Sequence, residues 1–185
     1  MGWRWRRSKC VRVCNFQKCY YFPLKSKLRQ LLRLPAYRKL LQHEFDRPRK
    51  PPLVSDVYDT SAWSELMGPP SSPTRRIALL YCSDGIPAFN KHRESISLIP
   101  CEWCNLSLPP TIRVQSRYML LQMIIPDTVK NEAQRKYYNF AANFELNEIF
   151  ENGIDGVKVY FFGMSMDTKG KEQILGMQTS QVYVL

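Results

Sequence analysis

A short apolar run that ends in an aspartate constrains the fold of this chain more than any other stretch. Residues 77–83 read Ile-Ala-Leu-Leu-Tyr-Cys-Ser, and Asp84-Gly85 follow directly. An apolar run of this length with a turn signal behind it predicts a buried strand that carries an acid at its carboxyl end. The segments that follow must then supply the partners that bury this strand.

Four later segments have the length and pattern of regular elements. They are two β-rich runs, one amphipathic helix and a second apolar run, at residues 95–106, 118–125, 131–152 and 157–162 in that order. Asp167 stands just beyond the last of them. The predicted order is strand, strand, strand, helix, strand, with an acid after the first and last strands. This is the order of the front half of a ribonuclease-H-like α/β fold, in which the first and fourth strands lie side by side and parallel.

The net charge of +11 comes from the first quarter of the chain. Residues 1–50 carry 15 Lys or Arg against Glu44 and Asp46, whereas residues 51–185 carry 12 basic and 14 acidic residues. Such a basic segment indicates a polyanion partner, most often nucleic acid, and a merely solvated basic face is the alternative. The candidate DNA-binding residues are Arg4, Arg6, Arg7, Lys9, Arg12, Lys18, Lys25, Lys27, Arg29 and Arg33.

Leucines recur at helical spacing between residues 22 and 41, with basic residues between them. Pro35 interrupts this pattern, which predicts two short helices. A basic amphipathic helix of this kind either lies on DNA phosphates or docks its leucines on the domain and leaves its basic face in water. In the later helix, by contrast, we interpret the charged residues, Glu145 and Glu148 among them, as a solvated face.

The cysteines allow one weak metal hypothesis. Four residues have a spacing compatible with zinc, although strong zinc sites have two-residue knuckles: Cys10, Cys14, Cys19 and His43. The alternative is a set of reduced thiols. Cys101 and Cys104 form a Cys-x2-Cys pair without a second pair nearby, and we interpret them as core residues. No run approaches the roughly 18 apolar residues of a membrane span, and the start of the chain lacks a secretory pattern.

Two proline-rich breaks, at residues 46–52 and 69–73, divide the chain. The expected units are a basic arm, a linker with a short helix around Trp63, and a partial ribonuclease-H-like core, over residues 1–50, 51–74 and 75–185. In the linker, Asp56 and Asp59 are interpreted as caps or turn formers.

An ordered set of short motifs runs through residues 10–180. It comprises Phe22-Pro-Leu24, Asp59 with Ala62-Trp63, Asp84-Gly85 with Phe89, Leu108-Pro-Pro110, Ile125-Pro126, Asn152-Gly153, and Asp167 with Leu175-Gly176. In this order the motifs resemble the Tnp2 group of transposases, the CACTA (En/Spm) type of DDE transposase found in eukaryotic DNA transposons. Two departures stand out: Pro87 lies one place earlier than the family's proline, and Thr168-Lys169 replace its Phe-Pro-Ala.

The resemblance implies metal-dependent DNA cleavage and strand transfer, with Asp84 and Asp167 as catalytic Mg²⁺ ligands. It also implies DNA as the partner and the nucleus as the location. The family's third acid would lie beyond residue 185, so we expect a transposase fragment that is inactive alone and holds Mg²⁺ weakly. One alternative is a non-catalytic DNA-binding module that uses its basic segment. Another is a protein that associates with itself through the exposed edge of an incomplete sheet.

Overall fold

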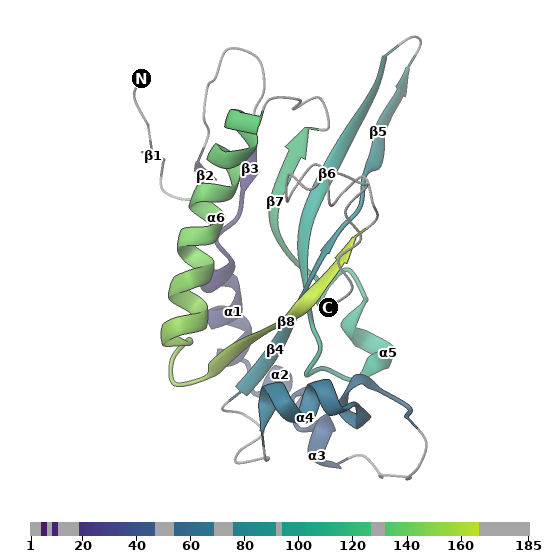
Figure 1. Cartoon of the computed structure of the whole chain (residues 1–185), viewed down its shortest axis with the longest axis vertical. Helices are drawn as coiled ribbons and strands as arrows, with labels where there is room; N and C mark the ends of the chain where they lie inside the picture. The colour runs from purple at the N-terminus through teal and green to yellow at the C-terminus, as the bar shows by residue number, and fades with distance from the viewer. Residues whose placement is uncertain are drawn as a thin grey trace.

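The computed structural model describes residues 5–6, 9–10, 19–46, 54–68, 76–91, 94–126 and 132–166. In these residues a mixed sheet lies between two groups of helices (Figure 1). Its strands are β3 (Tyr20–Tyr21), β4 (Arg76–Ser83), β5 (Ile86–Lys91), β6 (Glu94–Asn105), β7 (Leu120–Pro126) and β8 (Lys158–Met166). The helical elements are α1 (Leu24–Arg33), α2 (Pro35–Leu40), α3 (His43–Asp46), η1 (Val57–Asp59), α4 (Ser61–Met67), α5 (Pro110–Arg113) and α6 (Glu132–Asn152). Two short strands, β1 (Trp5–Arg6) and β2 (Lys9–Cys10), pair only with each other.

The sheet has the order β3-β7-β6-β4-β8, with β5 paired to β6. β4 is antiparallel to β6 and parallel to β8, and the parallel register joins Ser83 to Met166. The expected parallel neighbourhood of the first and last core strands is therefore confirmed. The sequence pattern predicts no regular element between residues 85 and 95, yet this stretch contains β5, which forms a hairpin with β6 (Figure 1).

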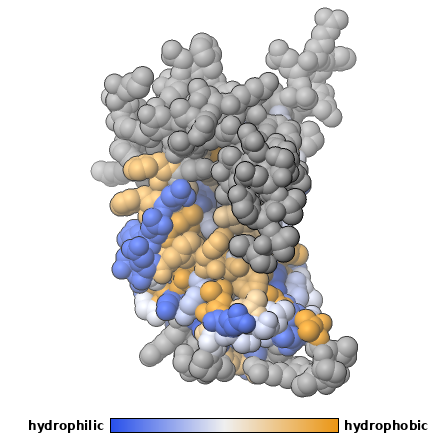
Figure 2. Space-filling view, in the orientation of Figure 1, coloured by the Kyte–Doolittle hydropathy of each residue, from blue (hydrophilic) through white to orange (hydrophobic). Residues whose placement is uncertain are grey.

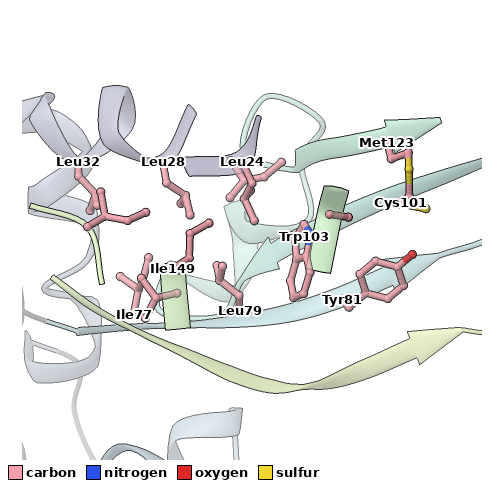
Figure 3. Close-up of a cluster of buried hydrophobic side chains, with 14 of the residues drawn as sticks. Leu24, Leu28, Leu32, Ile77, Leu79, Tyr81, Cys101, Trp103, Met123 and Ile149 are labelled. Atoms are coloured by element: carbon pink, nitrogen blue, oxygen red, sulfur yellow. The ribbon is translucent and has the colours of Figure 1, made fainter. Parts of the chain in front are cut away.

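One face of the sheet is covered by α1 and α6. Leu24 and Leu28 of α1 are fully buried and point toward Ile77 and Leu79 of β4, with Ile149 of α6 among them (Figure 3). Burial of each such side chain stabilises the fold by about 1.5–3 kcal/mol relative to exposure. The helix therefore docks its leucines on the sheet, and the predicted division into two helices at Pro35 is confirmed.

The opposite face of the sheet is covered by η1 and α4. Trp63 of α4 packs edge-on against Tyr58 and beside Phe162 of β8. Asp56 and Asp59 form a reciprocal capping box around η1, as the sequence analysis expected. A second, smaller hydrophobic cluster forms here around Ala78 of β4.

Two buried ion pairs help to hold this second layer, one to α5 and one between α3 and β4. Arg113 donates to both carboxylate oxygens of Asp56, at 2.9 and 2.7 Å. The Glu44 carboxylate accepts from Arg76 at 3.1 Å and from the Trp63 indole at 2.9 Å. Each of these pairs connects segments distant in sequence, so residues 54–68 are held by specific contacts as well as by apolar burial.

The amino end of α1 is capped by a residue from another helix. Pro23, which precedes α1, has no side-chain acceptor to offer its first N–H groups. The carboxylate of Glu145 on α6 accepts instead from the backbone N–H groups of Leu24 and Lys25, at 3.0 Å each, and from the Tyr21 hydroxyl. The interpretation of Glu145 as a solvated residue was therefore wrong. The described part of the predicted basic arm, residues 19–46, shares one core with the sheet.

The outer side of α6 carries Phe140 and Phe144, which are 69% and 71% exposed. Figure 2 shows polar side chains and apolar surface next to each other on the face where α6 flanks the sheet.

In the part of the chain that the structure describes, no helix has the length and apolar character of a membrane span.

Candidate metal site at the carboxyl end of β4

Asp84 lies at the end of β4, as the sequence predicts, and its side chain is exposed. It lines a pocket of about 380 Å³ whose other lining residues come from β4, β5, β6 and β8: Cys82, Ser83, Ile86, Pro100, Glu102, Ser165 and Met166. Four strands therefore contribute residues to the pocket that Asp84 lines.

Pro100 explains why the strand breaks at Asp84. Ser83 pairs with Cys101 and Ile86 pairs with Leu98, so one register continues across the gap and puts Pro100 opposite Asp84. Proline has no N–H to donate to a ladder. The carbonyl of Pro100 instead accepts the hydroxyl of Ser83 at 3.0 Å. The backbone at Asp84-Gly85 is therefore not part of a regular strand ladder.

Glu102 is a functional candidate that sequence reasoning missed. It pairs across the sheet with Cys82 and lines the same pocket as Asp84. The sequence offered one indication of its position: Glu102 stands between Cys101 and Trp103, whose side chains are both buried on the other face of β6. Alternation assigns Glu102 to the opposite side, but only the sheet order brings it next to β4.

The remaining polar groups of the pocket are a thiol and two hydroxyls. Burial, and after it the charge of Glu102, raises the pKa of the Cys82 thiol, so this group stays protonated at neutral pH. Ser165 of β8 pairs with Cys82 in the parallel ladder. The hydroxyl of Ser83 donates its hydrogen bond to the carbonyl of Pro100. The lining thus combines two carboxylates with neutral oxygen groups.

Asp167, the second predicted ligand, lies outside the described residues. The strand that precedes it in the sequence ends at Met166, which pairs with Ser83, the residue before Asp84. The juxtaposition of Asp84 and Asp167 therefore stays a prediction. Among the described residues, no group of three or more His, Cys, Asp and Glu side chains is arranged for a metal ion.

The predicted zinc set is only partly described. Cys14 and the side chain of Cys10 lie outside the described residues, while Cys19 is buried in the main core and the ring of His43 lies 6.1 Å from that of Tyr58. Cys101 and Cys104 are buried, as expected for core residues, and burial raises the pKa of each thiol to about 11.

Of the ten predicted DNA-binding residues, six are not described as side chains: Arg4, Arg6, Arg7, Lys9, Arg12 and Lys18. The other four lie on α1 and have partners within the fold. Lys25 pairs with Glu148, and Arg29 and Arg33 pair with Asp155 at 2.9 and 3.7 Å. Lys27 donates to the carbonyl of Met119 at 3.3 Å. Acids of α6 and of the turn after it therefore offset much of the positive charge of α1.

Comparisons of this chain with protein-family models, with curated proteins and with solved structures found no match.

Proposed function

We propose that this chain carries a ribonuclease-H-like core of the transposase type, whose pocket at the end of β4 binds a divalent cation for phosphodiester chemistry on DNA. The observation that carries the proposal is the parallel pairing of β4 with β8, which ends at Ser83 and Met166. Asp84 and Asp167 are the next residues in the sequence after Ser83 and Met166, which is why we propose that the two acids meet at this end of the sheet. Parallel strands whose carboxyl ends meet are a common origin of ligand sites in α/β proteins.

The chemistry of the described donors suits magnesium. Mg²⁺ prefers hard oxygen ligands and usually keeps several waters, so one or two carboxylates suffice to hold it. Asp84 and Glu102 supply two carboxylates to one pocket, and neither has a hydrogen bond or ion pair with another described residue. Bound divalent ions activate the attacking oxygen of a phosphodiester displacement and stabilise the leaving one.

The residues of this chain would orient the ion rather than carry out a proton transfer. The Pro100 break releases the backbone at Asp84 from the ladder, while Ser83 is fixed by its bond to the Pro100 carbonyl. The raised pKa of Cys82 keeps a neutral group beside Glu102. The bond of Ser83 and the neutral Cys82 favour an ordered pocket wall for a cation, which metal-dependent chemistry requires.

The simpler alternative of a DNA-binding module that uses α1 is less favoured. Three of the four α1 cations are paired with acids, so their charge is partly offset before any DNA arrives. Such pairs are individually weak at a surface, but together they lower the local potential that attracts phosphates.

An iron-substitution experiment tests the proposed site without requiring turnover. Fe²⁺ occupies oxygen-ligand sites in place of Mg²⁺, and with ascorbate and peroxide it generates hydroxyl radicals that cut nearby backbone. We expect protein cuts clustered near residues 84 and 102, and cuts in bound duplex DNA, with both suppressed by excess Mg²⁺.

Asp84→Asn is the decisive variant, because it keeps the size of the side chain and removes the charge. It should abolish the clustered cuts, whereas Glu151→Gln, at an exposed acid of α6, should leave them unchanged. Clustered cuts that persist in Asp84→Asn would refute the proposed site.

A further inference from the structure

The surface formed by α2 and the loop before β7 differs in charge balance from α1. The sequence contains no acid between residues 19 and 43 or between residues 103 and 126. Arg38 and Lys39 of α2 and Arg117 of the loop are exposed. None of the three forms an ion pair with another described residue. We refer to these three residues with Lys27 as the α2–loop surface.

Ring and hydrogen-bond contacts hold the α2–loop surface together. The guanidinium of Arg117 lies 4.9 Å from the centre of the Tyr118 ring, and that ring lies 6.5 Å from the ring of Tyr37 on α2. Lys27 of α1 donates to the carbonyl of Met119, the residue after Tyr118. Lys27 of α1 and Arg117 of the loop are therefore linked by these contacts to α2, in which Arg38 and Lys39 directly follow Tyr37.

This surface is also fixed to the sheet. Tyr37 is buried, and its hydroxyl accepts the side-chain amide of Asn105 on β6 at 2.9 Å. Burial, partly offset by this bond, raises the pKa of the Tyr37 hydroxyl to about 12, so it stays neutral. Because α2 is anchored in this way, Arg38 and Lys39 project from a rigid element, and a partner pays little to order it.

We infer that the α2–loop surface, rather than the paired cations of α1, binds the phosphate backbone of a DNA duplex. The inference rests on the proposed function for the choice of DNA as the polyanion. Several separated cations on rigid elements, without an acid among them, match a row of phosphates better than a single anion. Asn105 pairs with Leu79, five residues before Asp84, so the surface and the metal pocket are separated by roughly 17 Å along β4.

Two matched triple variants of the full chain test the inference. The first, Arg38→Gln with Lys39→Gln and Arg117→Gln, removes three unpaired charges. The second, Lys25→Gln with Arg29→Gln and Arg33→Gln, removes three paired charges and so changes the net charge equally. Circular dichroism melts verify folding, and fluorescence anisotropy with a short duplex of arbitrary sequence measures affinity across a salt series.

We expect the first variant to reduce the steepness of the log–log salt dependence by about 2.7, or 0.9 per phosphate contact. Between 50 and 200 mM salt, wild-type affinity would thus fall roughly 40-fold more than that of the variant. The second variant should change the slope by less than about 0.9, the value expected for one phosphate contact. The charge-conserving Arg38→Lys with Arg117→Lys should keep the wild-type slope.

Three results would overturn the inference. The first is an equal or larger slope change in the variant of paired charges. The second is an unchanged slope in the Arg38, Lys39 and Arg117 variant. The third is binding to anionic phosphatidylserine vesicles that depends on these three residues while duplex affinity does not. If the wild-type chain showed no affinity for duplex DNA, the DNA substrate of the proposed function would fail as well.

Discussion

Acidic side chains in two regions of this molecule differ in what surrounds them. Glu44, Asp56 and Glu145 each bind a cation or several N–H groups inside the fold. Asp84 and Glu102, at the pocket, have no such bond to any other described residue. The first group holds layers of the structure together, whereas the second forms no side-chain bond within the part of the chain that the structure describes. Among the described residues nothing competes for the carboxylates of Asp84 and Glu102, which favours the proposal that they bind a ligand.

The largest loss of stability should come from replacing Glu44, which is buried against both Arg76 and Trp63. Glu44→Ala leaves a buried guanidinium without its anion, and removal of one partner of such a pair costs about 3–5 kcal/mol. Urea unfolding followed by fluorescence measures the change. Glu65→Ala, at an exposed position of α4, is the control and should cost less than about 0.5 kcal/mol.

The next largest loss of stability should come from replacing Glu145, the residue of α6 that caps the amino end of α1. Glu145→Gln keeps the shape but weakens the bonds to the Leu24 and Lys25 N–H groups and to Tyr21. Hydrogen bonds to charged groups contribute about 1.5–3 kcal/mol each, so we expect a loss of about 2–3 kcal/mol. A fall in stability no larger than that of Glu151→Gln would show that the cap does not hold α1.

A smaller loss of stability should appear at alkaline pH, where a buried thiol rather than an acid is the titrating group. Burial raises the pKa of Cys101 to about 11, while an unfolded thiol titrates near 8.5. Above that pH the unfolded state loses a proton that the folded state keeps, so stability is full below about pH 8.5 and falls as the pH rises toward 11. The loss for this thiol reaches about 2 kcal/mol by pH 10.

The measurement is the free energy of unfolding between pH 7 and pH 10.5, in the wild type and in Cys101→Ala. The variant should be less stable at neutral pH, because it leaves a small cavity, but its stability should fall less steeply above pH 8.5. Equal slopes in the two proteins would contradict the assignment of the titration to Cys101.

The smallest effect on stability should come from the pocket acids. Because neither carboxylate has a hydrogen-bond or ion-pair partner among the described residues, Asp84→Asn and Glu102→Gln should each change the free energy of unfolding by less than about 0.5 kcal/mol. Thermal melts in the presence of a chelator check this expectation. A large destabilisation by either variant would mean that the two regions do not differ as described.

The sequence predicted those features that depend on local pattern. The apolar runs before Asp84 and Asp167 gave β4 and β8, and Pro35 gave the division between α1 and α2. β5 escaped prediction because residues 86–91, Ile-Pro-Ala-Phe-Asn-Lys, contain a proline and little alternation. Such short, mixed segments become strands only when a long partner, here β6, is present.

The roles of individual acids were harder to predict, since they depend on contacts distant in sequence. Glu145 reads as a polar residue on a helix, and its partners, Leu24 and Lys25, lie more than 100 residues away. Glu102 reads as the solvent side of a strand until the sheet order places it beside β4. The exposed position of Asp84, by contrast, follows from its place directly after an apolar run.

The most direct test of the central claim is titration calorimetry of the full chain with Mg²⁺ and Mn²⁺. We expect one site of modest affinity that is lost in Asp84→Asn, weakened in Glu102→Gln and unchanged in Glu151→Gln. Because the stability of the pocket variants should match the wild type, a loss of binding would report on the site and not on unfolding. Binding to Asp84→Asn as tight as to the wild type would contradict the claim that the acid at the end of β4 is a metal ligand.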